Sequence, residues 1–399
     1  MSRKKQPDIY TLVMPVIREE FPPNSVCTKG VLTAWGIPPS RTGDERPGRR
    51  LSWRARMHTT AGLLCAFVLL SSAPGRAQVP EEDRDFYLKE VLKGETGSIR
   101  SLLVDSHETL WIGSQAGLFF LREEGVVRAD GEDRAGMVNA LLESQGTVWA
   151  GGEKGLFRVG RDGMRRVPGD ETRLIYALSE SGGSLWLGAR NGLFRVADGT
   201  VGKHTDAKTG AVTALLEDGV TLWVGTNGLL MQKAGRLEPV KGVETGWVRA
   251  LLRSGSDLWI GADEGVFRVV DERSVRVEGD RTGRVYALEA TPGGKVRIGA
   301  FNGLFAVEDD RVLYKGSDDV KGILSLHADG DTLWIGALRG LFRWRAGEVV
   351  PVPGEPTGWV GTLLTNGETL WIGAEKGLFR LRDGKTVRVD TPVEHSSQH

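Results

Sequence analysis

Short apolar runs alternate with Gly, Asp and Asn along most of the chain, and one version of this pattern recurs. In Leu258–Val269 (LWIGADEGVFRV), an apolar run precedes a polar break and a second apolar run follows it. Close copies lie at Leu110–Leu121, Val148–Val159, Leu185–Val196, Leu333–Trp344 and Leu370–Leu381, and looser copies begin at Leu222 and Val296. Short runs rich in β-branched and aromatic side chains and bounded by turn formers predict β-strands. No helical period of about 3.6 residues runs through a repeat.

The spacing of the copies identifies a repeat architecture. The lead residue of the copies is Trp111, Trp149, Trp186, Trp223, Trp259, Arg297, Trp334 and Trp371, at intervals of 36 to 38 residues. Each repeat contains four strand candidates, for example TGWVRALLR, LWIG, VFRVV and VRVEG. Four short strands joined by tight turns form an antiparallel meander, which is one blade of a β-propeller. The sequence predicts an all-β, single propeller of eight four-stranded blades over residues 96–390, with seven blades plus an irregular terminal copy as the alternative.

The repeated residues are interpreted as scaffold. The seven Trp residues that lead the copies, and Leu-Phe pairs such as Leu341 and Phe342, are expected to pack between neighbouring blades, because one blade cannot bury both of its faces alone. Gly261 and Gly265 are expected where the chain turns sharply or a neighbouring backbone comes close. The strands of a blade are named A to D from the channel outward, and the loops that join blades are DA loops.

The repeat pattern V-x-A-L-L … D-G-x-L-W-I-G-[AT]-x-x-G-L-F-R resembles the two-component-regulator propeller repeat, over roughly residues 96 to 390. The resemblance implies a propeller of the type that forms the extracytoplasmic sensor half of many bacterial hybrid histidine kinases. Members of kinase type continue into an immunoglobulin-like module, a membrane helix and a kinase, none of which follows the repeats in this sequence. The resemblance therefore implies a sensor module without the kinase part, which would signal through a separate membrane protein.

The residues before the repeats are interpreted as segments connected with export. Residues 1–56 show no sustained periodicity and are predicted to be disordered or a misassigned extension. Residues 57–77 have the layout of a secretory signal peptide, in which an apolar core follows basic residues and Gly75-Arg76-Ala77 offers a cleavage site. The core, about ten residues long, is too short to span a bilayer. We expect an exported protein, periplasmic or extracellular, with no membrane span in the mature chain; the rival interpretation is a disordered arm ahead of a signal anchor.

Two segments that flank the repeats compete to complete the last blade. Residues 78–95 hold an acidic linker and FYLKEVLKGETG, which matches the outer strand and DA loop of a blade. Thr386–Asp390 (TVRVD) is a second outer-strand candidate, and it precedes a tail at residues 391–399 that is predicted to be disordered. We expect one of the two to close the ring as the D strand of the last blade, and the N-terminal segment is slightly favoured.

Charge and cysteine content exclude several classes of function. The chain has 52 basic and 52 acidic residues. Residues 1–56 contain 11 basic and 5 acidic residues, so the remainder contains 41 basic (52 − 11) and 47 acidic (52 − 5) residues. A mildly acidic propeller gives no electrostatic case for binding nucleic acid. Cys27 and Cys65 both precede the predicted cleavage site, so no disulfide or cysteine metal site is expected. His395 and His399 lie in the tail, and the other histidines after the predicted cleavage site, His107, His204 and His327, lie in different repeats with no HxH or HxxxH spacing, so neither a metal nor another cofactor is predicted.

The candidate binding site is the mouth of the central channel. In an up-and-down meander, the DA loops and the loops between strands B and C (BC loops) emerge on the same face. Aromatic, Arg and Asn side chains at their variable positions suit a glycan, a peptide or an anionic small molecule, or a protein partner. The predicted ligand-binding residues are Arg100, Asn139, Tyr176, Trp247, Arg249, Arg284, Tyr286 and Trp359. The BC loops add Gln115, Lys154, Arg190, Asn191, Asn227, Phe301, Asn302, Arg339 and Lys376.

Two of these residues are of most interest. Trp247 and Trp359 are each extra to the Trp that leads a repeat, so the scaffold alone does not account for them. The alternative is that they cap the A strands as packing, because amphipathic aromatic side chains often serve that purpose.

Catalytic motifs are sparse in this sequence. It contains no GxSxG, GxxxxGK[ST] or HExxH, and Asp105, Asp218 and Asp329 are interpreted as turn formers. We therefore expect a non-catalytic binding or sensor module with a role in signal transduction. One alternative is a lyase or hydrolase in the style of the propeller lyases that open streptogramin rings, which would need a convergent acid/base group in the channel. The other is a structural assembly scaffold with a flat mouth and an apolar lateral or lower face.

Overall fold

The computed structural model of the protein describes residues 96–390, apart from residues 124, 130–133, 161–162, 205–208, 220, 234, 292 and 317–318. The predictions for the extension, the signal peptide, the linker at residues 78–95 and the tail at residues 391–399 lie outside the described residues. Within the described part of the chain, no helix is long and apolar enough to cross a membrane.

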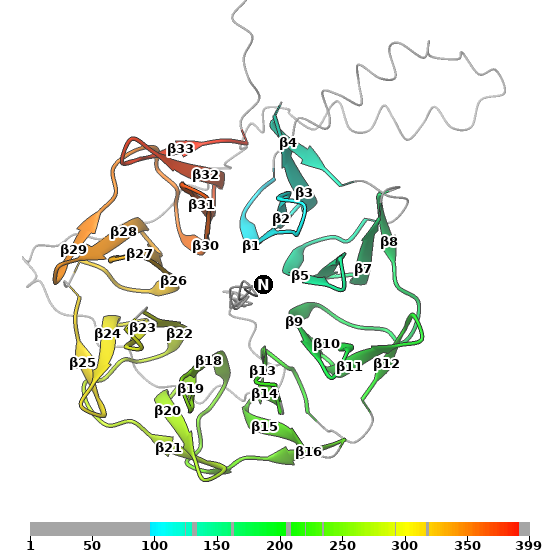
Figure 1. Ribbon diagram of the computed structural model, residues 1–399, viewed down its shortest axis with the longest axis horizontal. Coiled ribbons are helices and arrows are strands. Elements are labelled where there is room, and N and C mark those ends of the chain that lie inside the picture. Colours follow the sequence, from blue (N-terminus) through cyan, green and yellow to red (C-terminus); the bar gives the residue numbers. More distant parts are fainter. Residues whose placement is uncertain are drawn as a thin grey trace, which may run out of the picture. The chain divides into compact units, whose positions relative to one another are not determined.

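The described residues form eight sheets arranged around a ring, as Figure 1 shows. Blades 1 to 4 comprise β1 (Ile99–Val104), β2 (Leu110–Ser114), β3 (Gly117–Arg122) and β4 (Gly125–Arg128); β5 (Val138–Ser144), β6 (Thr147–Gly152), β7 (Gly155–Gly160) and β8 (Gly163–Arg166); β9 (Ile175–Ser181), β10 (Ser184–Ala189), β11 (Gly192–Ala197) and β12 (Thr200–Lys203); and β13 (Ala214–Glu217), β14 (Leu222–Thr226), β15 (Gly228–Lys233) and β16 (Arg236–Pro239).

Blades 5 to 8 continue the same order, with one short additional strand, β17 (Lys241–Gly242). They comprise β18 (Val248–Ser254), β19 (Asp257–Ala262), β20 (Gly265–Val270) and β21 (Arg273–Arg276); β22 (Val285–Ala290), β23 (Val296–Ala300), β24 (Gly303–Glu308) and β25 (Arg311–Tyr314); β26 (Ile323–Asp329), β27 (Thr332–Ala337), β28 (Gly340–Arg345) and β29 (Glu348–Pro351); and β30 (Val360–Asn366), β31 (Thr369–Ala374), β32 (Gly377–Arg382) and β33 (Lys385–Arg388).

Each blade is an antiparallel meander whose four strands pair in sequence order. In blade 3, for example, Trp186 of strand B lies opposite Ser179 of strand A and Arg195 of strand C. The prediction of an all-β propeller with eight four-stranded blades is therefore confirmed, and the seven-blade alternative is excluded.

The last blade is completed by the C-terminal candidate strand. β33 pairs with β32, Arg380 lying opposite Val387, and so supplies the D strand of blade 8. The slight preference for the N-terminal segment in this role was wrong, because two matching outer-strand sequences flank the repeats and only their pairing distinguishes them. The ring closes where blade 8 packs against blade 1: Trp371 lies in one buried cluster with Ile99 and Phe119.

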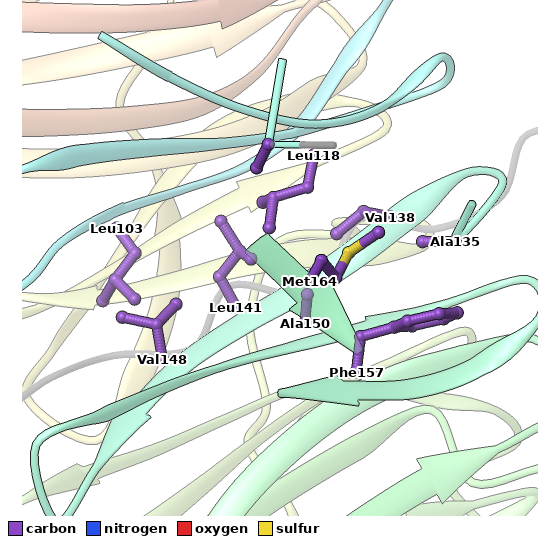
Figure 2. Close-up of a cluster of buried hydrophobic side chains, with 10 residues drawn as sticks. Leu103, Leu118, Ala135, Val138, Leu141, Val148, Ala150, Phe157 and Met164 are labelled. Carbon is purple, nitrogen blue, oxygen red and sulfur yellow. The ribbon is translucent and has the colours of Figure 1, made fainter. Parts of the chain in front are cut away.

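The hydrophobic core lies between adjacent blades. Figure 2 shows one such cluster, in which Leu103 and Leu118 of blade 1 pack against Val138, Leu141 and Phe157 of blade 2. The lead Trp residues lie in or against these interblade clusters, as the blade-stacking argument expects.

The glycines of the repeat have the two roles expected from the sequence. A Cβ atom at Gly261 would lie 2.6 Å from Cγ1 of Val285 in the next blade, so only glycine permits the close approach of these two blades. Gly265 has a φ of +125°, in the region that favours glycine.

A short backbone contact at the outer edge joins consecutive blades. After blade 2, Gly169 forms a parallel bridge with Val201 in the D strand of blade 3, and the amide of Asp170 donates to the Val201 carbonyl at 2.7 Å. The Asp170 carboxylate also accepts from the Lys203 amide at 2.7 Å. We call this arrangement a rim clamp. Gly242, Gly279 and Gly354 form equivalent bridges with the D strands of blades 5, 6 and 8.

Candidate functional site

The DA and BC loops lie together on one face of the propeller, which we call the top face. The amide of Gln115 in a BC loop donates to the carbonyl of Ser98 in a DA loop at 2.9 Å. The amide of Glu375 donates to the carbonyl of Trp359 at 2.8 Å in the same way. These hydrogen bonds agree with the parity argument and make the two loops of a blade one structural unit. The opposite face, formed by the AB and CD loops, is the bottom face.

Five of the eight predicted ligand-binding residues share one backbone feature. Where strand A enters from the top face, its register with strand B shifts by one residue, so that one residue of strand A has no partner. Such a β-bulge re-aims the extra side chain. The extra residues are Arg100, Asn139, Tyr176, Arg249 and Tyr286. Trp247, Arg284 and Trp359 immediately precede their A strands, so all eight residues lie at the top-face ends of the innermost strands.

Several bulge side chains reach the next blade. Asn139 is only 3% exposed, and its Nδ2 donates to the carbonyl of Ile175 at 3.0 Å. The guanidinium of Arg249 pairs with Asp263 at 2.5 Å and lies over the ring of Tyr286, 5.6 Å from its centroid. The Asn139 hydrogen bond and the Arg249–Tyr286 contact join neighbouring blades, while the Arg249–Asp263 pair lies within blade 5, so both residues have a structural role.

Arg100 and Trp359 meet where the ring closes. The Arg100 guanidinium lies over the Trp359 ring, 5.4 Å from its centroid, and the indole is half-buried. Because the two residues belong to blade 1 and blade 8, this stack spans the closure of the ring. Both the packing and the binding interpretation of Trp359 are compatible with this position.

Exposed apolar side chains gather on the top face of blades 5 to 7. Trp247 is 37% exposed, Phe301 51% and Leu338 41%, and we call these three residues the apolar arc. Phe301 and Leu338 share one position, the first residue of the BC loop, which is polar in the other six blades. The equivalent residues are Gln115, Glu153, Arg190, Asn227, Asp263 and Glu375. The scaffold therefore does not require an apolar residue at this position.

Backbone hydrogen bonds fix two members of the arc beside each other. The carbonyl of Phe301 accepts from the Gly322 amide at 2.8 Å, and the carbonyl of Gly322 accepts from the Leu338 amide at 3.0 Å. A Cβ atom on Gly322 would overlap the Leu338 side chain, so the glycine leaves room for it. Leu338 was not among the residues predicted from the sequence. Alignment of the repeats by their BC loops, rather than a search for polar side chains, is the signal that identifies it.

Two titratable residues, one buried and one half-buried, lie in the A strands toward the bottom face. Glu289 and His327 occupy a position that is Leu in five of the other blades. Burial raises the pKa of Glu289 to about 7, and its Oε1 accepts from the amide of Ala328 at 2.9 Å. Burial lowers the pKa of His327, whose Nε2 lies 2.9 Å from Oγ1 of Thr365. Each side chain is hydrogen-bonded to its neighbouring blade, so these two residues do not form an acid/base pair that converges on one ligand position.

Metal ligands do not gather in the part of the chain that the structure describes: no group of three or more His, Cys, Asp or Glu residues is arranged to hold a metal ion there.

Comparison with known proteins supports the fold and gives no family. No protein-family model matches the chain, and no curated protein matches it. Among solved structures, it is similar to the extracellular domain of a putative one-component system from B. thetaiotaomicron, with 17% identity and a TM-score of 0.50 over 74% of this chain and 52% of that chain. The chain thus spans about half the length of that structure.

Two further solved structures are similar to the chain. The computationally designed Ika8 protein matches with 19% identity and a TM-score of 0.56, over 72% of this chain and 96% of that chain. Virginiamycin B lyase from Staphylococcus aureus matches with 13% identity and a TM-score of 0.46, over 72% of this chain and 95% of that one. At such low identity these likenesses show the fold alone, and a TM-score below 0.5 gives no argument for lyase chemistry.

Proposed function

We propose that the propeller is a non-catalytic binding module of a sensing system, and that its top face captures an apolar peptide or protein segment. The observation that carries this proposal is the apolar arc, in which Trp247, Phe301 and Leu338 expose apolar surface over three adjacent blades. A cluster of exposed apolar side chains with polar surroundings is typical of an interaction surface. The glycan and small-anion alternatives predict polar and aromatic residues at these positions rather than Leu338.

The sensing role is supported by two weaker observations. The repeat resembles that of extracytoplasmic sensor propellers, and a similar structure is the extracellular domain of a putative one-component system. On this proposal the protein is exported, to the periplasm or the extracellular space, and it passes its signal to a separate membrane protein. A scaffold role without a specific ligand is one alternative. Lyase chemistry is the other, and the hydrogen bonds of Glu289 and His327 to their neighbouring blades do not bring the two side chains together as an acid/base pair.

The proposal is tested by selecting peptides on the purified protein and measuring their affinity by isothermal titration calorimetry. About half of the Phe301 side chain is exposed, or roughly 100 Å² of apolar surface if an aromatic residue offers about 200 Å². Burial of this area contributes about 2.5 kcal/mol, so Phe301→Asp should weaken binding by well over tenfold.

Val275→Asp is the matched control, because Val275 is 46% exposed but lies in β21 at the outer edge of blade 5. It should bind selected peptides as the wild type does. Peptides that bind Phe301→Asp and the wild type equally would contradict the proposal. Selective binding of a glycan in place of peptides would instead favour the lectin-like alternative.

A further inference from the structure

Blade 6 departs from the repeat where it meets blade 7. In five blades, the lead Trp of strand B lies opposite an Arg of strand C; these pairs are Trp149 and Arg158, Trp186 and Arg195, Trp259 and Arg268, Trp334 and Arg343, and Trp371 and Arg380. In blade 6 the strand B residue is Arg297, and Ala306 lies opposite it. In blade 7, Trp344 occupies a strand C position that holds Val, Leu or Gln in the other blades.

These departures rebuild the arginine–tryptophan stack between two blades. The guanidinium of Arg297 lies over the ring of Trp344, 4.4 Å from its centroid. Within blades 3 and 5, the corresponding Arg and Trp of one blade are 5.7 Å apart. Blade 7 thus supplies the aromatic ring that blade 6 lacks. At the strand C position where five blades have an arginine, blade 6 has Ala306, whose side chain is only a methyl group. The Arg297 side chain can therefore lie inward.

The inward arginine lacks hydrogen-bond acceptors. Arg297 is only 6% exposed, yet its Nε and Nη1 have no hydrogen-bond partner, and neither has Nε1 of Trp344. The carboxylate of Glu308 is 4.0 Å from Nη1, and it accepts a hydrogen bond from Lys315 at 2.7 Å. A buried donor without an acceptor costs about 1–3 kcal/mol, and more if it is charged, so three such donors in one place need an explanation.

These donors adjoin a pocket on the bottom face. The pocket has a volume of about 310 Å³ and is lined by Arg297, Trp344 and residues of the AB loops of blades 6 and 7, among them Thr291 and Asp331. This volume lies at the lower end of the range for small-molecule sites. An oxyanion in the pocket would supply the missing acceptors, because each carboxylate or phosphate oxygen accepts from more than one donor.

We propose that this pocket is a second binding site, on the face opposite the apolar arc, for a small carboxylate anion. Glu308 lies 4.0 Å from Arg297 and Asp331 lines the pocket, so these two carboxylates repel a monocarboxylate, with one negative charge, less than dianionic phosphate, with two. The flat ring of Trp344 and the side chain of Leu333 offer apolar contact for the remainder of the ligand. The site does not depend on the binding role proposed for the top face.

A pocket of similar volume between blades 3 and 4 provides an internal control. It measures about 290 Å³ and is lined by residues that include Trp186 and Arg195. There Nε1 of Trp186 donates to the carbonyl of Ser181 at 3.3 Å, and Arg195 donates to Oγ of Ser184 at 2.6 Å. Because these donors already have acceptors, this pocket gains less from an anion.

The test is a titration of the full chain, labelled with ¹⁵N in its tryptophan indoles, followed by nuclear magnetic resonance. The probes are sodium acetate, sodium benzoate and inorganic phosphate, each compared with sodium chloride at equal ionic strength. Trp344→Phe assigns the Trp344 indole signal. We expect acetate and benzoate to shift this signal saturably, and benzoate to bind more tightly because its ring adds apolar contact. In Arg297→Met, affinity should fall by at least about tenfold, as expected for loss of a charged hydrogen-bond donor.

Arg195→Met should bind both carboxylates as the wild type does. The proposal is wrong if the Trp344 signal does not saturate, if chloride shifts it equally, or if Arg297→Met keeps the wild-type affinity. Phosphate that binds more tightly than both carboxylates would overturn the assignment of the ligand class. If Arg297→Met does not fold, Arg297→Lys replaces it, since lysine keeps the charge but loses the planar donor set and should also bind more weakly.

Discussion

The rim clamp offers a sharp test of how blades are joined, through the substitution Gly169→Ala. Gly169 has a φ of +131°, and a Cβ atom there would lie 2.1 Å from the carbonyl oxygen and 2.5 Å from the amide nitrogen of Val201. Both are backbone atoms of the neighbouring blade, so no side chain can rotate away. The alanine variant must therefore separate Gly169 from Val201 and break the clamp.

The cost follows from the bonds that the clamp contains. Separation would break the hydrogen bonds from Asp170 to the Val201 carbonyl (2.7 Å), from Val201 to the Pro168 carbonyl (2.8 Å) and from Lys203 to the Asp170 carboxylate (2.7 Å). At about 1 kcal/mol each, these amount to about 3 kcal/mol. An alanine at positive φ adds about 1–2 kcal/mol. Gly169→Ala should thus lower the free energy of unfolding by about 4–5 kcal/mol.

Gly199→Ala is the matched control, because Gly199 has a φ of +73° and a Cβ atom there would meet nothing within 4 Å. It should cost only the conformational part, about 1–2 kcal/mol. Urea denaturation followed by tryptophan fluorescence measures both variants, and hydrogen exchange at the Val201 amide reports the clamp itself. Equal destabilisation by the two substitutions, with Val201 still protected in Gly169→Ala, would refute the steric argument.

Two further predictions concern buried polar residues. The pKa of Glu289 is about 7 in the folded protein against an ordinary 4.5, so the folded state holds the proton more tightly and stability falls as pH rises from about 4.5 to about 7. Glu289→Gln should remove about 3 kcal/mol of this pH-dependent loss of stability. The free energy of unfolding, measured with urea, should therefore differ less between pH 4.5 and pH 8 in the variant than in the wild type. An unchanged difference would contradict the prediction. Asn139→Ala should lower stability by about 1–3 kcal/mol, because the carbonyl of Ile175 loses its donor, and an unchanged urea midpoint would oppose this.

The sequence is sufficient for the fold because the repeat presents the same evidence eight times. The lead Trp, the turn glycines and the alternation of apolar runs each recur with one period, and tight turns allow only a meander. The shared face of the DA and BC loops follows from parity alone. The terminal strand is different: FYLKEV and TVRVD have equally good strand patterns, and only the pairing of β33 with β32 distinguishes them.

The sequence placed the candidate residues at the ends of the A strands, but it did not show which of them pack between blades and which stay exposed. Asn139 and Trp247 both occupy variable positions at the ends of A strands, yet one is buried with a bonded amide and the other is exposed. That difference arises from the spacing to the next blade, which the sequence does not encode locally. Arg297 was visible as an exception to the lead Trp. Its relation to Trp344 was not, because the contact joins two repeats 47 positions apart (344 − 297).

All four strands of each blade come from one continuous stretch of the sequence, and this has a consequence for engineering. Among the strands at residues 96–390 that the structure describes, none crosses from one end of the repeat region to the other. Blade 8 meets blade 1 through side chains, among them Trp371 against Ile99 and the Thr96 hydroxyl bonded to the Asp390 carboxylate. The chain could therefore begin and end between a different pair of blades, and the arrangement of the blades around the ring would stay the same. Circular permutants that join blade 8 to blade 1 by a linker and open another DA loop would keep every strand pair, so a fused reporter domain can be placed between any chosen pair of blades.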